Sequence, residues 1–404
     1  MQTSLAADIK DTPQGRQADL ILRSCVHCGF CTATCPTYQE LNDERDGPRG
    51  RIYLIKQVLE GKPVGETTRQ HLDRCLSCRS CETTCPSGVH YARLLDIGRE
   101  IVEERLPRSS GQRFMRRVLR IALRTPWLFR TGLAVGQGLR GILPGSLRAQ
   151  VPVKRRRGDW PTSPHSRTML TLAGCVQNGL APDIDAAAAR VLDRLGIRLK
   201  PASGGGCCGL LSHHLTATQE ARADARANID AWWPDVQAGA EAIVITASAC
   251  GAMVKDYPQL LADDPDYREK AITVAKLAKD ISEVLSKEDL SLLRVRQKRI
   301  AFHSPCSLQH GQKLGGQVER LLQQVGFQLT ATSENHLCCG SAGTYSIFQP
   351  TLSQRLRQRK LDALNGDSPQ AIATANIGCL VHLQGGTELP VKHWVEWLDA
   401  GLGS

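Results

Sequence analysis

The residues best able to do chemistry are the 16 cysteines, and eight of them fall into two matching frames. The first frame is CVHCGFCTATCP at 25–36 and the second is CLSCRSCETTCP at 75–86. Both read C-x2-C-x2-C-x3-C-P. Three thiolates at this interval can wrap one corner of a polynuclear metal cube. A tetrahedral zinc site uses cysteines in pairs and gives a third one no role, so the frames indicate clusters rather than single zinc ions.

The cysteine that precedes the proline in each frame has a separate role. In two-cluster ferredoxins with this run, the fourth cysteine binds the cluster that the other frame otherwise holds. The spacing therefore predicts two 4Fe-4S clusters with shared ligands. The first is expected on Cys25, Cys28, Cys31 and Cys85, and the second on Cys75, Cys78, Cys81 and Cys35.

The other eight cysteines belong to a longer internal repeat. In each half, a leading cysteine is followed after 31 residues by a Cys-Cys-Gly (CCG) triplet, and an apolar run then reaches one more cysteine. Two neighbouring thiolates can bind separate atoms of one polynuclear centre. The expected ligands are Cys175, Cys207, Cys208 and Cys250 in the first CCG repeat, and Cys306, Cys338, Cys339 and Cys379 in the second.

The elements that must position these cysteines are of two kinds. Between the two frames, GPRGRIYLIKQVLEG has apolar residues at helical intervals, which predicts a mostly α-helical domain. In each CCG repeat, strands alternate with helices, which predicts parallel sheets with the outer cysteines at the carboxyl ends of strands. The expected fold class is α + α/β. The expected parts are a ferredoxin-like domain at 1–104, a basic linker at 105–165, and CCG repeats at 166–294 and 295–404.

The metal of the CCG repeats is left open by the sequence. An iron-sulfur cluster is expected in at least one half, and the alternatives are a structural zinc or a half without metal. His27 lies inside the first frame and either hydrogen-bonds a cluster sulfur, which would raise the potential of the cluster, or is an ordinary loop side chain. Four other histidines lie near the CCG cysteines, and each either fills an open metal position, moves protons or is a loop or neighbouring side chain. They are His213, His214, His303 and His310.

Positive charge is concentrated in one stretch. Fourteen of the 51 Lys and Arg residues lie between Arg105 and Gly158, where there is no Asp or Glu. Within it, RFMRRVLRIALR predicts an amphipathic helix with arginines 113, 117, 120 and 124 on one face and Phe114, Val118 and Ile121 on another. Such a helix can bind an anionic membrane surface, pack as a linker on its own protein, or dock an acidic partner. Nucleic acid is disfavoured because aromatic residues make up only 4% of the chain.

Other function classes are excluded or disfavoured. The first residues lack the apolar segment of a signal peptide, so the chain is expected in the cytoplasm, where cysteines stay reduced and available to metal. GGGCCG does not open a G-x-G-x-x-G dinucleotide turn. With every cysteine assigned to a metal set, no catalytic nucleophile is predicted, and the chain is expected to carry electrons rather than hydrides.

The whole chain resembles the iron-sulfur subunits of bacterial glycolate oxidase (glycolate dehydrogenase). The segments that carry the resemblance are ILRSCVHCGFCTATCPTYQE, DGPRGRIYLIKQVLEG, NIDAWWP and HLCCGSAGTY. It implies a complex in which FAD-containing subunits oxidise glycolate to glyoxylate. It further implies that electrons pass through this chain toward quinone, at the inner face of the cell membrane. Iron-sulfur subunits of lactate or glycerol-3-phosphate dehydrogenases are more distant relatives.

One departure bears on a competing function. In heterodisulfide reductases, the CCG repeat ends in C-x-x-C and supplies five thiolates to a disulfide-reducing centre. Here Ala247 and Asn376 occupy the first position of that pair, so four thiols remain in each half. The resemblance therefore favours electron transfer, with disulfide reduction at a CCG centre as the alternative and a zinc-dependent nucleic-acid binder as a third class.

Overall fold

The structure is a computed structural model that describes residues 1–142, 144, 151–296 and 298–402. Residues 143 and 145–150 of the basic stretch lie outside the described residues. The chain divides into two compact units. The first unit comprises Met1–Met115 and His336–Lys360, and the second comprises Arg116–Asn335 and Leu361–Ser404.

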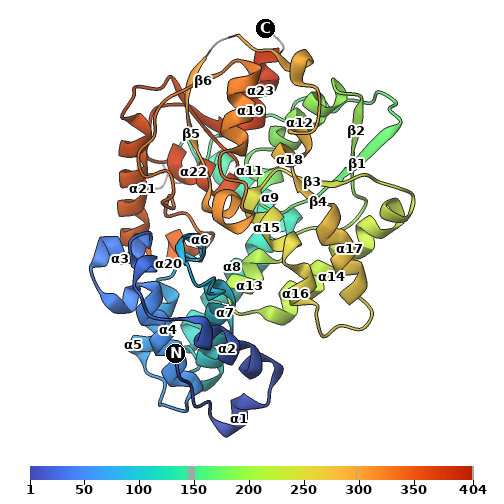
Figure 1. Cartoon of the computed structure of the whole chain (residues 1–404). Coiled ribbons are helices and arrows are strands. Elements are labelled where there is room, and N and C mark those ends of the chain that lie inside the picture. Colours follow the sequence, from blue (N-terminus) through green and yellow to red (C-terminus); the bar gives the residue numbers. More distant parts are fainter. Residues whose placement is uncertain (143, 145–150, 297, 403–404) are drawn as a thin grey trace. The chain divides into compact units, whose positions relative to one another are not determined.

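The first unit is built from helices, drawn in blue to teal for its N-terminal part (Figure 1). They are α1 (Ala7–Lys10), α2 (Pro13–Ser24), η1 (Phe30–Thr32), α3 (Pro36–Leu41), η2 (Glu44–Asp46), α4 (Pro48–Leu59), α5 (Glu66–Asp73), α6 (Ser80–Thr84) and α7 (Tyr91–Arg105). The prediction of an α-helical N-terminal domain is confirmed.

Helices α4 and α7 form the centre of this unit. Helix α4 begins with Pro48 at its first position, where the missing N–H costs no hydrogen bond. Ile52 and Ile55 of α4 are buried. Gly98 of α7 allows the two helices to approach closely, because a Cβ at this position would lie 2.7 Å from Ile55 Cγ1. This packing fixes the loops that carry the cysteines.

The segment His336–Lys360 belongs to the first unit although it lies within the second CCG repeat in sequence. It contains α20 (Tyr345–Phe348) and the start of α21 (Pro350–Asn365). Arg355 on α21 donates a hydrogen bond from Nη2 to the backbone oxygen of Glu40 at 3.0 Å and lies 3.1 Å from its carboxylate. The CCG triplet of the second repeat is therefore part of the same compact unit as the two frames.

The predicted amphipathic helix is α8 (Ser110–Arg124), and α9 (Pro126–Leu139) follows it. Phe114, Val118 and Ile121 on α8 are all exposed. Arg120 forms an ion pair with Glu220 at 3.0 Å, and Arg124 forms one with Asp224 at 2.7 Å. Two of the four arginines on the predicted basic face thus form ion pairs with acidic residues of their own unit, the second.

Two four-stranded parallel sheets form the second unit, with strand orders β2-β1-β3-β4 and β6-β5-β7-β8. The orders are equivalent, which confirms the predicted duplication. The strands are β1 (Arg167–Thr171), β2 (Ile197–Pro201), β3 (Ile243–Ile245), β4 (Ala278–Asp280), β5 (Arg299–His303), β6 (Gln328–Leu329), β7 (Ala371–Thr374) and β8 (Val391–His393).

Helices follow the strands, as parallel connections require. In the first repeat they are α11 (Gln177–Leu180), α12 (Asp183–Asp193), α13 (Leu210–His214), α14 (Thr218–Gln237), α15 (Ser248–Lys255), α16 (Tyr257–Leu260), α17 (Arg268–Leu277), α18 (Ile281–Leu285) and η3 (Leu290–Leu293). In the second they are η4 (Ser307–Gly311), α19 (Gln317–Val325), α21, α22 (Ile377–Gln384) and α23 (Trp394–Leu402).

The two repeats contact each other through the loops that follow β3 and β7. The backbone N–H of Ser248 donates to the oxygen of Ala375 at 3.0 Å, and that of Ala249 donates to Asn376 Oδ1 at 3.3 Å. These loops lie at the carboxyl ends of the strands, where Cys250 and Cys379 follow. The duplication therefore joins the two halves next to their predicted metal ligands.

Candidate metal centres

The first cysteine group consists of Cys25, Cys28, Cys31 and Cys85. Cys25 caps the end of α2, Cys31 lies in η1 and Cys85 caps the end of α6. All four line one pocket, together with Cys81 from the neighbouring group. The group thus joins three cysteines of the first frame to the last cysteine of the second.

Burial and mutual repulsion govern the thiols of this group. Burial, together with the charges of the nearby Cys25, Cys35 and Cys85, raises the pKa of the Cys31 thiol to about 11. Burial also raises the pKa of Cys25, although the backbone N–H of His27 acts in the opposite direction. A bound cation removes this penalty by stabilising thiolates. The donor set therefore fits an iron-sulfur cluster.

The second cysteine group consists of Cys35, Cys75, Cys78 and Cys81. Burial strongly raises the pKa of Cys81, and the next causes are the sulfurs of Cys78, Cys75 and Cys35. Cys75 Sγ accepts hydrogen bonds from the backbone N–H of Ser77 at 3.5 Å and from Tyr91 Oη at 3.6 Å. This group joins three cysteines of the second frame to the last cysteine of the first, and its donors fit a second cluster.

The loops of the two frames have the same backbone conformation. His27 and Gly29 have positive φ angles of 55° and 89° in the first frame, and Ser77 and Arg79 have 53° and 60° at the corresponding positions of the second. The N–H two residues after the leading cysteine points to its sulfur in both. Identical spacing therefore produces the same ligand loop twice.

A buried arginine lies beside the second cysteine group. Arg51 on α4 donates from Nε to the backbone oxygen of His71 at 2.7 Å and from Nη1 to Thr37 Oγ1 at 3.1 Å. Thr37 Oγ1 in turn lies 3.3 Å from Cys35 Sγ. Arg51 was not among the site residues predicted from the sequence. The sequence pattern that could have indicated it is its spacing from Ile55 and Val58, four and seven residues later, which places this arginine on the buried face of the helix.

Asp46 faces the Arg51 guanidinium. Its Oδ1 lies 3.4 Å from Arg51 Nη2, and its Oδ2 lies 3.0 Å from Arg74 Nη1. Ligand atoms of Asp43, Asp46 and His71 come within 4.8 Å of one another. Because guanidinium groups already engage Asp46, we interpret this grouping as an ion-pair network rather than a metal site.

The first CCG centre brings together all four of its predicted cysteines. Cys207 accepts hydrogen bonds from the thiols of Cys175 and Cys208, which lowers its pKa, and Cys208 is also hydrogen-bonded to Cys250. Cys175 follows β1, and Cys250 lies in the first turn of α15 after β3. The parallel sheet therefore delivers the outer cysteines to the CCG triplet, as its topology predicts.

The triplet of the first repeat is held by side chains behind it. Asn228 Nδ2 donates to the backbone oxygen of Cys207 at 2.7 Å, and Tyr257 Oη donates to that of Cys208 at 3.0 Å. Gly209 has a φ of 88°, and a Cβ there would lie 3.0 Å from the backbone oxygen of Ala221. This explains why a glycine ends the triplet.

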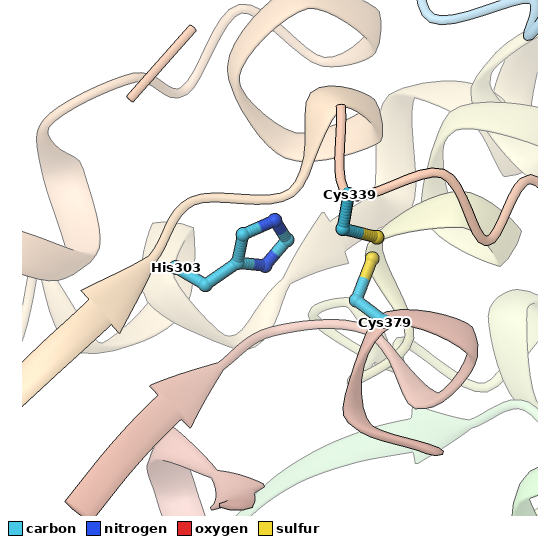
Figure 2. Close-up of side chains that lie close together, drawn as sticks. All are labelled: His303, Cys339 and Cys379. Carbon is cyan, nitrogen blue, oxygen red and sulfur yellow. The ribbon is translucent and has the colours of Figure 1, made fainter. Parts of the chain in front are cut away.

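The second CCG repeat includes a histidine among its sulfurs. Figure 2 shows His303 at the end of β5 together with Cys339 and Cys379, and their ligand atoms lie within 4.8 Å of one another. His303 Nδ1 lies 2.9 Å from Thr374 Oγ1. Cys306 directly precedes η4, and Cys338 directly precedes Cys339. Of the histidines considered from sequence, His303 is the one that the structure places in such a sulfur cluster among the described residues.

The two repeats differ at the positions that depart from the five-thiolate pattern. Ala247 is buried and precedes α15. Asn376 instead donates from Nδ2 to Cys379 Sγ at 3.5 Å. Leu172, three residues before Cys175, corresponds in the first repeat to His303, three residues before Cys306. At these two positions the second repeat therefore has polar side chains where the first has apolar ones.

The other histidines have separate places. His213 and His214 lie on α13, just after the first CCG triplet, with ring centroids 6.3 Å apart. His310 is buried in η4. His27 lies between Cys25 and Cys28, and burial lowers its pKa.

Comparison with known proteins assigns the family. The model of the cysteine-rich CCG domain matches residues 169–255 and 300–384, and that of the 4Fe-4S dicluster domain matches residues 21–89. The glycolate oxidase iron-sulfur subunit of Escherichia coli is 53% identical, with 100% of this chain and 99% of that protein covered. The probable glycolate oxidase iron-sulfur subunit of Bacillus subtilis is 30% identical, with 91% and 89% covered. Lactate utilization protein A of Shouchella clausii is 26% identical, with 56% and 96% covered. On the pattern of its cysteines, its duplicated fold and these matches, the chain belongs to the family of glycolate oxidase iron-sulfur subunits.

Proposed function

We propose that this chain is the electron-transferring subunit of a complex that oxidises glycolate to glyoxylate. The observation that carries the proposal is the gathering of the two frames into two groups of four thiols, each group completed by a cysteine of the other frame. Paired clusters within one helical unit suit a conductor that moves single electrons between other molecules. The glycolate substrate is taken from the names of the relatives.

The first cysteine group would hold one 4Fe-4S cluster and the second group would hold another. Such clusters, when bound, accept and release one electron at a time, with potentials set by ligands, hydrogen bonds and solvent. The chain's own residues supply the thiolate ligands and the backbone N–H groups of His27 and Ser77 that point to sulfur. These contacts hold the loops in the shape that each cluster requires.

The CCG repeats would carry further metal. The first CCG centre offers four sulfurs linked by hydrogen bonds, which suits either an iron-sulfur cluster or zinc. The second offers Cys306, Cys338, Cys339 and Cys379, with His303 beside two of them. We propose iron-sulfur occupancy in at least one half, and metal analysis distinguishes it from zinc.

The partners would be FAD-containing subunits that oxidise the substrate, and quinone would receive the electrons. The relatives are named as subunits, which implies a complex. A flavin can take two electrons from a 2-hydroxy acid and release them singly, which matches the one-electron clusters. The chain would act as the link between that flavin and the quinone.

A cytoplasmic protein of this kind would meet quinone by binding the inner face of the cell membrane. No helix among the described residues has both the length and the apolar character of a membrane span. Helix α8, however, exposes Phe114, Val118 and Ile121 beside its basic residues. Because Glu220 and Asp224 engage Arg120 and Arg124, the membrane charge would come from Arg113 and Arg117.

Sedimentation with anionic vesicles tests the membrane contact. Arg113→Glu with Arg117→Glu, or Phe114→Ser with Ile121→Ser, is expected to leave the protein in the supernatant. Arg45→Glu, which changes an exposed arginine outside α8, is the matched control and should sediment like the wild type. Unchanged sedimentation of both α8 variants would refute the contact.

Anaerobic purification with metal analysis tests the function itself. The expected protein is brown, contains about eight or more irons per chain and shows electron paramagnetic resonance of reduced 4Fe-4S clusters. It should be reduced by a glycolate-oxidising flavin subunit in the presence of glycolate. A colourless zinc protein that never assembles clusters after reconstitution with iron and sulfide would overturn the proposal.

A further inference from the structure

Charged side chains are buried beside the second cysteine group. Arg51 is 1% exposed and Asp46 is 0% exposed. Arg74 is the second guanidinium on the same carboxylate. Asp43 pairs with Arg45 at 2.8 Å, at the surface. Two arginines thus share one buried carboxylate, which leaves one positive charge in excess at this place.

Two hydroxyl groups lie next to the sulfurs of the second cysteine group. Thr37 is 1% exposed and bridges Arg51 to Cys35, with 3.1 Å from the guanidinium to the hydroxyl and 3.3 Å from the hydroxyl to the sulfur. The Thr37 hydroxyl accepts from Arg51 and donates its proton to the backbone oxygen of Asp46 at 2.7 Å, so it positions the guanidinium close to Cys35. Tyr91, buried on α7, donates to Cys75 at 3.6 Å. The positioned charge and the Tyr91 hydrogen bond both stabilise negative charge on sulfur.

The first cysteine group has a different environment. Helix α4 also carries Arg49, which lies near Gly29 in the loop of the first group. The Arg49 side chain is 38% exposed and forms an ion pair with Glu44 at 2.6 Å. Cys28 of this group is exposed. Water and a paired carboxylate screen a charge far more than a protein interior does. The two groups therefore sit in different electrostatic surroundings despite identical ligand spacing.

We infer that Arg51, acting with Thr37 and Tyr91 as positioning residues, raises the reduction potential of the cluster in the second cysteine group above that in the first. An electron added to a cluster increases its negative charge, so a fixed buried cation and hydrogen bonds to sulfur favour the reduced form. The inference rests on the proposed function in that both clusters must be present. An electron on the exposed cluster would then move to the buried one, oxidising the first and reducing the second.

A redox titration of the anaerobic full chain, followed by electron paramagnetic resonance, tests this order. Cys28→Ser and Cys78→Ser identify which signal belongs to which group. Arg51→Gln is expected to make the reduction equilibrium of the second cluster at least tenfold less favourable, a shift of about 59 mV toward lower potential for one electron. The midpoint of the first cluster should stay within a third of that shift. Asp46→Asn removes the opposing charge and is expected to move the second midpoint upward.

Matched variants keep the test decisive if Arg51→Gln does not fold. Thr37→Val and Tyr91→Phe each remove one hydroxyl with little change of shape, and both should lower the second midpoint by a smaller amount. Arg108→Gln removes another buried guanidinium, one that is paired with Asp73 and Glu103, and should move neither midpoint. Arg51→Lys keeps the charge and should retain more of the potential than Arg51→Gln.

The outcomes separate the inference from the proposed function. A wild-type protein without clusters would overturn the function itself. If the wild-type protein has two clusters, and neither midpoint moves in Thr37→Val, Tyr91→Phe or Arg51→Gln, the inference alone is overturned. Equal shifts of both midpoints would also overturn it, since they would show a general effect of the substitution.

Discussion

The two cysteine frames share a pattern and a backbone but not an environment. In both, positive φ angles at the same two positions turn the ligand loop around its cluster. The first loop is open to solvent at Cys28 and carries Phe30 with 61% of its surface exposed. The second is flanked by the buried Arg51 and Tyr91. Short-range spacing therefore defines a ligand set, whereas the charge and dielectric around it come from helices elsewhere in the chain.

Loss of the cysteine that each frame supplies to the other group should have the strongest consequence. Cys85→Ser should disturb the cluster of the first group, with loss of up to about four irons per chain, because the fourth ligand comes from the other frame. Cys35→Ser should do the same to the second group. Iron analysis with electron paramagnetic resonance measures both. If Cys85→Ser instead removed the signal that Cys78→Ser removes, the frames would each bind their own cluster.

The ion pairs beside the two groups should differ in their contribution to the free energy of unfolding. Asp46→Ala leaves Arg51 buried without its carboxylate and should lower the free energy of unfolding by about 3–5 kcal/mol. Glu44→Ala removes the exposed partner of Arg49 and should cost less than about 1 kcal/mol. Urea unfolding of the anaerobic protein measures the difference. Equal costs would show that the second environment is less dehydrated than its burial indicates.

The left-handed backbone conformation in the loops of the two frames should make a smaller contribution to stability. Gly29 has a φ of 89°, and a Cβ at this position would lie 3.0 Å from Arg49 Nη1. Gly29→Ala should therefore cost about 1–2 kcal/mol in the free energy of unfolding. Gly132→Ala on α9 is the control, since nothing lies within 4 Å of its Cβ and the change should be neutral or stabilising. A neutral Gly29→Ala would show that this loop is not held in the left-handed conformation.

The smallest effect concerns the open side of the first loop. Phe30→Ser should change the free energy of unfolding by no more than about 0.5 kcal/mol, because the side chain is mostly in solvent. Thermal unfolding of the isolated chain measures it. A loss of 2 kcal/mol or more, by the scale of buried side chains, would mean that this loop is packed rather than open.

Much of the candidate site could be predicted from the sequence because the spacing of cysteines is a local property of the chain. The eight-cysteine pattern predicted the two cluster groups, and the repeated CCG triplets predicted the duplicated sheets that the structure contains. The ligand groups themselves remain predictions until metal is measured. Arg51 was not predicted as a neighbour of the second group, since nothing within α4 shows that this arginine reaches Thr37 and His71 from other segments.

Residue type and spacing alone predicted which atoms can bind metal, how often the motif recurs and to which family the chain is similar. Contacts within the folded chain were needed to show that the segment His336–Lys360 belongs to the helical unit, that His303 lies beside Cys339 and Cys379, and that the buried Arg51 guanidinium lies beside the second cysteine group. Burial and charge pairing arise from contacts between residues far apart in the chain, which local spacing does not encode.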